Sequence, residues 1–325
     1  MTDDITSNSL ESEGIRNKVF FGDCRDSMRE LIAQGVNVQM CVTSPPYFGL
    51  RDYGHPGQLG LEPTPAEYVA AMVEVFALVR ELLADDGVLW LNLGDSYNSV
   101  GHKKSSSGYG TSGLAGGEQT HTPLRRENNC PGLKHKDLIG IPWRVAFALQ
   151  EAGWYLRQDI IWHKPNPMPE SVTDRCTKSH EYLFLLAKSE RYYFDAEAIA
   201  EASVTPIDTK AAQSFKAKGG KAIENYGTSQ DNWKPTGTRN KRSVWTVATA
   251  PYSGAHFATF PPALIEPCIL AGSRVGDVVL DPFMGSGTTG QVAQALGRQW
   301  IGCELNPAYE QLQMDRTAQA SFALG

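Results

Sequence analysis

The tetrapeptide Ser44-Pro45-Pro46-Tyr47, here called the clamp, ends an apolar run in a way that suits the binding of a planar ring. Two adjacent prolines cannot donate backbone hydrogen bonds, so the run cannot continue as a central strand, and their carbonyl groups are expected to stay free. The Ser44 hydroxyl is a further acceptor, and Tyr47 offers a flat face. Acceptors that hold both hydrogens of an exocyclic amine reduce conjugation of the nitrogen lone pair, which makes the nitrogen a nucleophile. The alternative is an ordinary Ser-Pro-Pro turn beside a core tyrosine.

A nucleobase amine is paired and stacked inside a duplex, so its ring would first have to be flipped out of the helix. Proximity and orientation then supply much of the rate, and the acceptors stabilise the charge that develops on nitrogen. This chemistry needs no metal ion and no covalent intermediate with the protein.

A glycine-rich segment, Asp281 to Thr289 and here called the glycine loop, lies between a predicted strand and a predicted helix. Glycine lets the backbone turn sharply and lets a ligand approach it, and the helix N-terminus adds unpaired N–H donors. Glu304 ends the next predicted strand, a position that reaches ribose hydroxyls in a doubly wound sheet. The pattern Gly-x-Gly-Thr-Thr therefore predicts an adenosine-type ligand. It disfavours a dinucleotide and hence an oxidoreductase.

Short apolar runs alternate with helical patterns, which predicts an α/β fold with a doubly wound, mostly parallel sheet. The clearest helix spans Pro65 to Ala84: Thr64 and Glu67 form a capping box, and Asp85-Asp86-Gly87 is expected to end the helix. Residues 98–137 are polar and without period, and they are predicted to form a long mobile loop.

Composition indicates an ordinary globular protein of 325 residues with a net charge of −6. Two segments, 101–136 and 208–242, carry an excess of Lys and Arg, as expected of local phosphate-binding faces or of solvated loops. The six cysteines show no Cys-x-x-Cys spacing, which argues against a zinc site or a disulfide framework. The sequence shows neither a signal peptide nor an apolar membrane span, so a cytoplasmic location is expected.

Taken together, these motifs resemble those of the S-adenosylmethionine-dependent DNA amino-methyltransferases in the β arrangement, from about Val19 to Tyr309. The matching segments, in chain order, are FFGDC (20–24), TSPPY (43–47), DIIWHKPNPMPES, SHEYLFLLAKS, HFATFPPALIEPCI (256–269), DPFMGSGTT (281–289) and GCELNP (302–307).

The resemblance implies the methyltransferase sheet of seven-stranded type, circularly permuted so that the catalytic half comes first. The expected division is a catalytic half at 15–200, an inserted recognition region at 201–245 and a cofactor-binding half at 246–320. The resemblance assigns S-adenosylmethionine to Asp23, Asp281, Phe283, Gly285, Ser286, Gly287, Thr288, Glu304 and Phe257.

The expected substrate is double-stranded DNA. Ser-Pro-Pro-Tyr is typical of methylation at N4 of cytosine, whereas Asp-Pro-Pro-Tyr is typical of N6 of adenine, and adenine stays the alternative. Phosphate contacts are expected from Lys234, Arg239, Lys241 and Arg242. The resemblance leaves open whether a cognate restriction endonuclease accompanies the enzyme and whether it acts as a monomer or a homodimer.

Three further features are ambiguous in the sequence. Asp95 fits either positioning of the target base or capping of a turn, and His180 and Glu181 are expected to orient neighbouring backbone. Trp162, His163 and Lys164 fit either a DNA contact or a core tryptophan beside a solvated lysine.

The remaining alternatives are a protein or RNA methyltransferase and a DNA-binding relative without activity. The former usually carries Asn-Pro-Pro-Tyr after the cofactor loop, the reverse of the order in this sequence. The latter is expected to have lost Ser44 or the glycines, and this sequence retains both.

Overall fold

The computed structural model describes residues 14–98, 130, 132–203, 237–249 and 260–322. Most of the predicted loop at 98–137, most of the predicted recognition region, Lys234 and Phe257 lie outside these residues. Within the described residues, no helix is long and apolar enough to cross a membrane.

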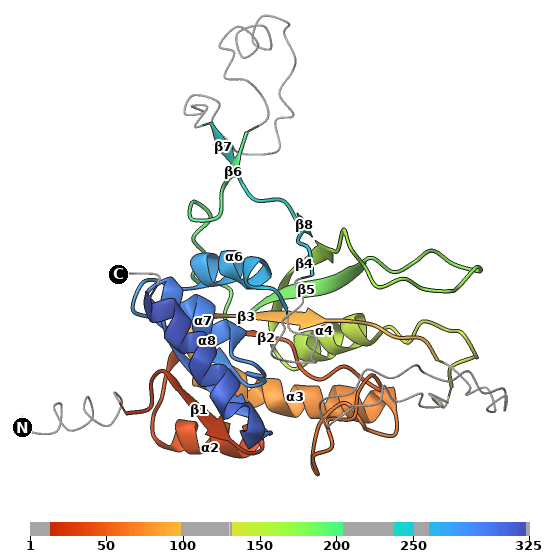
Figure 1. Ribbon diagram of the computed structural model, residues 1–325, viewed down its shortest axis with the longest axis horizontal. Coiled ribbons are helices and arrows are strands. Elements are labelled where there is room, and N and C mark those ends of the chain that lie inside the picture. The colour runs from red at the N-terminus through yellow and green to blue at the C-terminus, as the bar shows by residue number, and fades with distance from the viewer. Residues whose placement is uncertain (1–13, 99–129, 131, 204–236, 250–259, 323–325) are drawn as a thin grey trace, which may run out of the picture.

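One large sheet organises the molecule (Figure 1). Its spatial order is β1-β10-β9-β2-β3-β5-β4-β8, and all neighbours pair in parallel except β5, which is antiparallel to β3 and β4. The strands are β1 (Lys18–Phe21), β2 (Val38–Thr43), β3 (Leu83–Leu93), β4 (Tyr155–His163), β5 (His180–Ala187), β8 (Val244–Thr246), β9 (Val278–Asp281) and β10 (Gln299–Glu304). The predicted doubly wound, mostly parallel sheet is confirmed, with the short β8 as an eighth strand.

Helices cover both faces of the sheet (Figure 1). One apolar layer is formed with α2 (Cys24–Ala33), α3 (Pro65–Leu82) and α4 (Ile141–Glu151), and the opposite layer with α6 (Pro262–Gly272) and α7 (Thr288–Ala295). The short η2 (Pro307–Tyr309) leads into α8 (Glu310–Phe322), which packs on α7. Successive side chains of a strand point to opposite faces of the sheet, so one strand contributes to both apolar layers. In β2, Cys41 packs in the first layer and Met40 and Val42 pack in the second.

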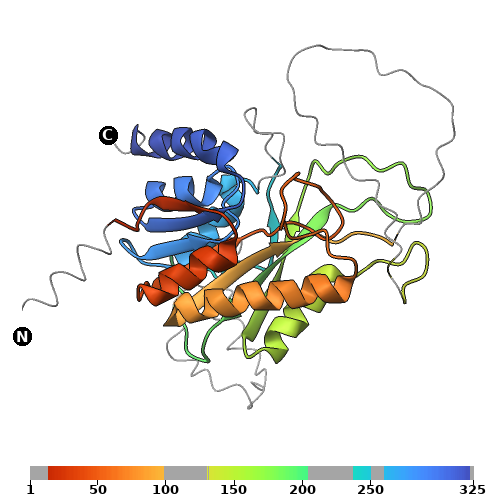
Figure 2. The ribbon, with the colours of Figure 1, turned by 90° about the horizontal axis from the view of Figure 1, so that it is seen from below.

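The late strands β9 and β10 lie between the early strands β1 and β2. Figure 2 shows this insertion, with the red first strand beside the blue C-terminal strands and the green strands toward the opposite end of the sheet. The clamp and the glycine loop, far apart in the sequence, therefore follow neighbouring strands, because β9 pairs with β2.

The end of α3 differs from the prediction. The capping box of Thr64 and Glu67 is present, with Thr64 Oγ1 accepting from Glu67 N at 3.2 Å. The helix, however, stops at Leu82, and Leu83 already has extended dihedrals (φ −68°, ψ 142°). Asp85-Asp86-Gly87 lies inside β3, where an irregular register against β2 accommodates it. The pairing of Leu83 with Val38 thus overrides the local turn signal.

A second, two-stranded sheet pairs β6 (Glu201–Ala202) with β7 (Thr238–Arg239) at the two ends of the predicted recognition region. After β7 the chain returns to the main sheet, where β8 pairs with β4. Neither β8 nor α6, a helix with Pro267 inside it, was expected from local sequence pattern.

Candidate active site

The carboxyl ends of β1, β10, β9 and β2 meet at one edge of the sheet, where open α/β folds place ligand sites. A cavity there, open to solvent, encloses about 1060 Å³ of empty space including its mouth. Ser44 and Pro46 of the clamp share its wall with Asp23, Phe283, Gly285, Ser286, Thr288 and Glu304. The two motifs, far apart in sequence, therefore adjoin in space.

Both proline carbonyls of the clamp were expected to stay free, but one of them is hydrogen-bonded. Pro46 O accepts a hydrogen bond from the Tyr68 hydroxyl at 2.9 Å, because the first turn of α3 packs beneath the clamp. Within the described part of the chain, no group donates to Pro45 O. The clamp thus keeps the Ser44 hydroxyl and the Pro45 carbonyl as acceptors.

The Tyr47 hydroxyl lies in a polar cluster. It is 2.7 Å from Glu181 Oε2, 3.1 Å from Asn92 Oδ1 and 3.4 Å from Ser44 Oγ. Burial, followed by the Glu181 carboxylate, raises the pKa of the Tyr47 hydroxyl well above its ordinary range. The expectation that Glu181 orients backbone is wrong, since its partners are the side chains of Tyr47, Asn92 and Lys164.

Asp281 lies beneath the cavity and is absent from its wall. Its carboxylate accepts from Thr43 Oγ1 at 2.6 Å, Thr289 Oγ1 at 2.5 Å and Phe283 N at 3.0 Å. Burial raises the pKa of Asp281, and the three hydrogen bonds oppose that shift. Asp281 therefore joins the end of β2, one residue before Ser44, to the glycine loop and to the start of α7.

Glu304 holds the opposite side of the glycine loop. Its carboxylate accepts from Gly285 N and from Asn306 N, each at 2.8 Å. Burial raises the pKa of Glu304 to about 7 despite these hydrogen bonds. The cavity thus has a carboxyl group with capacity to accept further hydrogen bonds, at the position where a ribose was expected.

Helix α8 supports the glycine loop from behind. Gln313 Nε2 donates to Gly285 O at 2.7 Å, and Arg316 Nη1 donates to Ser286 Oγ at 2.6 Å and also to Thr288 Oγ1. Gly287, at φ +89°, faces Gln313, whose Cα would lie 3.2 Å from an added Cβ, and Gly287 is not on the cavity wall. Gly287 therefore serves close packing of loop and helix.

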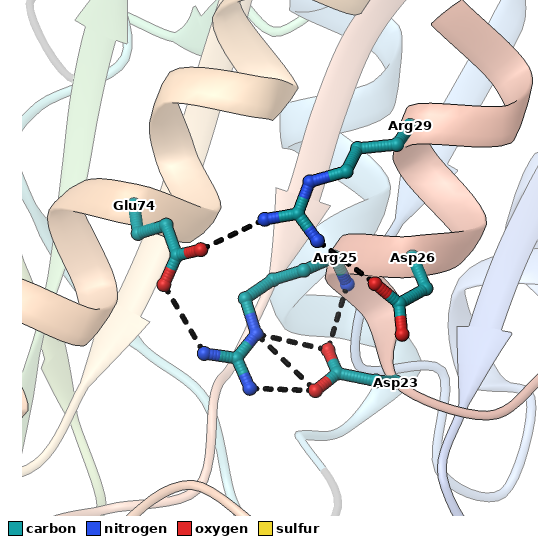
Figure 3. Close-up of polar contacts among 5 residues, drawn as sticks. All are labelled: Asp23, Arg25, Asp26, Arg29 and Glu74. Carbon is teal, nitrogen blue, oxygen red and sulfur yellow. Dashed lines mark hydrogen bonds and ion pairs between the residues drawn. The ribbon is translucent and has the colours of Figure 1, made fainter.

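Asp23 is on the cavity wall but is already engaged (Figure 3). Its oxygens receive the Arg25 guanidinium at 2.6 to 3.2 Å and the Arg25 backbone N–H at 2.9 Å. Arg25 also binds Glu74 of α3, which holds Arg29 as well. Arg25 lowers the pKa of Asp23, so this carboxylate stays ionised beside the cavity.

The described basic residues of the recognition region are partly neutralised. Arg239 and Arg242 both lie near Glu201 Oε2, at 3.4 and 3.3 Å, and the Lys241 ammonium lies 5.0 Å from the centre of the Trp245 ring. Arg242 remains exposed.

Two ambiguous features are resolved by their contacts. Asp95 Oδ1 accepts from Ser96 N, Gly140 N and Ile141 N, so Asp95 caps a turn and the start of α4. Trp162 is a core residue, but Lys164 is not solvated, because it pairs with Glu181 and lies 4.2 Å from the Trp162 ring centre.

Sequence reasoning missed one wall of the cavity. It is formed by Tyr53, His55, Gln58 and Leu59 after the clamp and by Tyr309 after β10, and it adjoins Phe260, Leu305 and Asn306 of segments that the resemblance had already named. Gly49 N donates to Gly60 O at 2.8 Å, which closes the segment that follows the clamp into a compact loop. The turn-rich sequence from Gly49 to Gly60 was the available signal, although it does not say where the loop packs.

Solved structures that include a DNA methyltransferase share this architecture. The chain resembles PvuII DNA methyltransferase (cytosine-N4-specific) with a TM-score of 0.58 and 19% identity over 94% of this chain and 89% of that one. It also resembles M1.HpyAVI with a TM-score of 0.52 and 18% identity over 92% of this chain and 97% of that one. At these identities the likeness establishes the fold.

Sequence comparison identifies the family. The N6/N4 methyltransferase model, described as DNA methylase, matches residues 38–315. The chain is 46% identical to type II methyltransferase M.SmaI of Serratia marcescens, over 96% of this chain and 94% of that protein. It is 46% identical to type II methyltransferase M.Cfr9I of Citrobacter freundii, over 95% and 90%. The chain therefore belongs to the N4/N6 DNA methylase family, as its motifs predicted.

Proposed function

We propose that this protein transfers a methyl group from S-adenosylmethionine to the N4 amine of a cytosine flipped out of double-stranded DNA. The supporting observation is the shared cavity wall, on which Ser44 of the clamp adjoins Gly285 and Glu304 of the cofactor half. Methyl transfer requires a donor and an acceptor in one cavity, and the shared wall supports that arrangement. M1.HpyAVI and the Thermus thermophilus protein TTHA0409 have both been solved in complex with this cofactor.

The residues present fit that cofactor. Glu304, whose carboxylate is held by two backbone N–H groups, is suited to accept from ribose hydroxyls. An added Cβ at Gly22 or Gly57, both on the cavity wall, would meet no protein atom within 4 Å, so the glycines leave room at the wall. Ionised Asp23 lies on the same wall, so an adenine amine there would share its carboxylate with Arg25. When bound, the cofactor supplies a methyl group activated by a sulfonium.

The clamp handles the other reactant. In this proposal, Ser44 Oγ on the cavity wall and Pro45 O next to it in the chain accept from the two hydrogens of the target amine, which favours pyramidal, nucleophilic nitrogen. Tyr47 supplies a ring face for stacking, and the network around its hydroxyl fixes the ring in place. The residues thus orient the amine and stabilise the positive charge that grows on it.

Cytosine is favoured over adenine by Ser44, since the serine form of the motif is typical of N4 methylation. Adenine N6 is the second candidate, because its amine presents the same two hydrogens to the clamp. The relatives that share most of their length with this chain are named type II methyltransferases. We infer that the protein protects a short DNA site, in the manner of a modification enzyme paired with a nuclease.

The test is product analysis. The purified protein is incubated with bacterial DNA and cofactor carrying a labelled methyl group, and the DNA is digested to nucleosides that are separated and weighed. We expect N4-methylcytosine. N6-methyladenine would select the second candidate, and absence of labelled nucleoside would refute the proposal. Ser44→Ala should reduce methyl transfer at least about a hundredfold while cofactor binding persists, since one of two amine acceptors is removed.

A further inference from the structure

The Tyr47 hydroxyl links the clamp to a charged cluster on the antiparallel strand. It carries one proton and has three polar neighbours: Glu181 Oε2 at 2.7 Å, Asn92 Oδ1 at 3.1 Å and Ser44 Oγ at 3.4 Å. The shortest distance is to Glu181, and a carboxylate is the stronger acceptor. Tyr47 therefore donates its proton to Glu181.

That donation sets the direction of the next hydrogen bond. Because the Tyr47 proton points to Glu181, the Tyr47 oxygen presents lone pairs to Ser44, which donates in turn. The Ser44 proton is then directed toward Tyr47, and the Ser44 lone pairs are left to accept from the target amine. With the opposite sense, Tyr47 would occupy one Ser44 lone pair and the Ser44 proton would be free to point at the amine.

The Glu181 carboxylate is held in place by groups on other strands. Asn92 Nδ2, on β3, lies 3.3 Å from Glu181 Oε2 and donates to Tyr182 O at 3.1 Å. Lys164, at the end of β4, pairs with Glu181 Oε1 and is itself held over the Trp162 ring. Glu181 thus binds Lys164 with one oxygen and Tyr47 with the other.

We propose that Glu181 is a positioning residue, the end of a hydrogen-bond chain from Ser44 through Tyr47, and that this chain also carries away the proton that the amine loses. The proposal rests on the proposed methyl transfer and adds a route for the proton. Nothing in the clamp motif indicates it, because Glu181 is 134 residues from Tyr47.

Methyl transfer forms one bond, breaks another and releases one proton. The amine lone pair forms the N–C bond to the methyl group, and the C–S bond breaks with its electrons left on sulfur. The nitrogen, now positive, releases one proton to Ser44 Oγ as the Ser44 proton passes to Tyr47 and the Tyr47 proton to Glu181. The methylated base ends neutral and Glu181 ends protonated. Its side chain is 16% exposed, which lets solvent take the proton.

Charged and titratable groups surround Glu181. Besides Tyr47 and Lys164, they are Lys178, on the loop that precedes β5, and His180, which is adjacent on the strand. Burial lowers the pKa of both Lys178 and His180.

The first test compares Glu181→Gln with Glu170→Gln. Glu170 is a matched control because it forms an ion pair with Arg175 at 2.5 Å on the same β4–β5 connection but does not contact the clamp. Single-turnover methyl transfer is measured with cofactor and DNA saturating. We expect Glu181→Gln to be slower by about a hundredfold, within the range for positioned acid–base groups, with unchanged cofactor affinity, whereas Glu170→Gln should keep the wild-type rate.

A second variant tests the same hydrogen-bond chain even if Glu181→Gln does not fold. Tyr47→Phe retains the ring and removes only the hydroxyl, so it should be slowed to a similar extent, again with unchanged cofactor affinity. The double variant should be about as slow as the slower single variant, because members of one chain act as a unit. Multiplying effects, or a wild-type rate in either variant, would overturn the relay. A wild-type protein that forms no methylated base would instead refute the proposed function.

Discussion

The raised pKa of Glu304 predicts that cofactor binding depends on pH. Burial at the end of β10 shifts this pKa from 4.5 to about 7, so at neutral pH about half of the cofactor-free protein carries a neutral Glu304. In the proposed function, the ionised form is the one that accepts from two ribose hydroxyls. Binding should therefore require loss of a proton from the neutral fraction, and acid should oppose it.

The magnitude follows from the pKa. If only the ionised form binds, the dissociation constant is multiplied by one plus the ratio of protonated to ionised Glu304. With a pKa of about 7, that factor is about 1.1 at pH 8, about 2 at pH 7 and about 11 at pH 6. Affinity should thus fall about tenfold between pH 8 and pH 6. The same pKa means that Glu304 favours the folded, cofactor-free state below pH 4.5 and that this contribution is lost as pH rises through about 7.

Calorimetric titration with S-adenosylhomocysteine, in buffers of different ionisation enthalpy, measures both affinity and the protons released. Glu304→Gln is the matched control, since it keeps the shape but cannot titrate, and any pH dependence that it retains belongs to the ligand or to other groups. The reasoning is refuted if wild type and Glu304→Gln share one pH profile. It is refuted equally if wild-type affinity is flat between pH 6 and pH 8.

Two further changes test the site and the DNA face. Gly94→Ala would place a Cβ 2.4 Å from Tyr47 Cε2, so the ring must move by about 1 Å; methyl transfer should fall by about a hundredfold, with cofactor affinity unchanged in calorimetry. Normal turnover by this variant would show that the Tyr47 position is not critical. The double change Lys241→Ala with Arg242→Ala should weaken DNA binding across sequences and reduce the slope of log affinity against log salt by about two, measured by fluorescence anisotropy. An unaltered slope would argue against a phosphate-binding face there.

The amino-acid sequence alone determined the parts of this protein that depend on local chemistry. The capping box at Thr64 and Glu67 and the alternation of β2 follow from residues close together in the chain. The clamp and the glycine loop were recognisable for the same reason, because proline and glycine restrict or free the backbone wherever they occur. From these motifs followed the doubly wound sheet and the family.

Only the tertiary structure decided which polar groups remain available to a ligand. Asp281 is used to join Thr43 to Thr289, Pro46 O is taken by Tyr68, and Asp23 is shared with Arg25. Glu181 meets Tyr47 because β5 runs antiparallel beside β3, a pairing that no local pattern specifies. The physical reason is that a side chain's type defines what it can donate or accept, whereas packing of distant strands and helices decides which partner it finds.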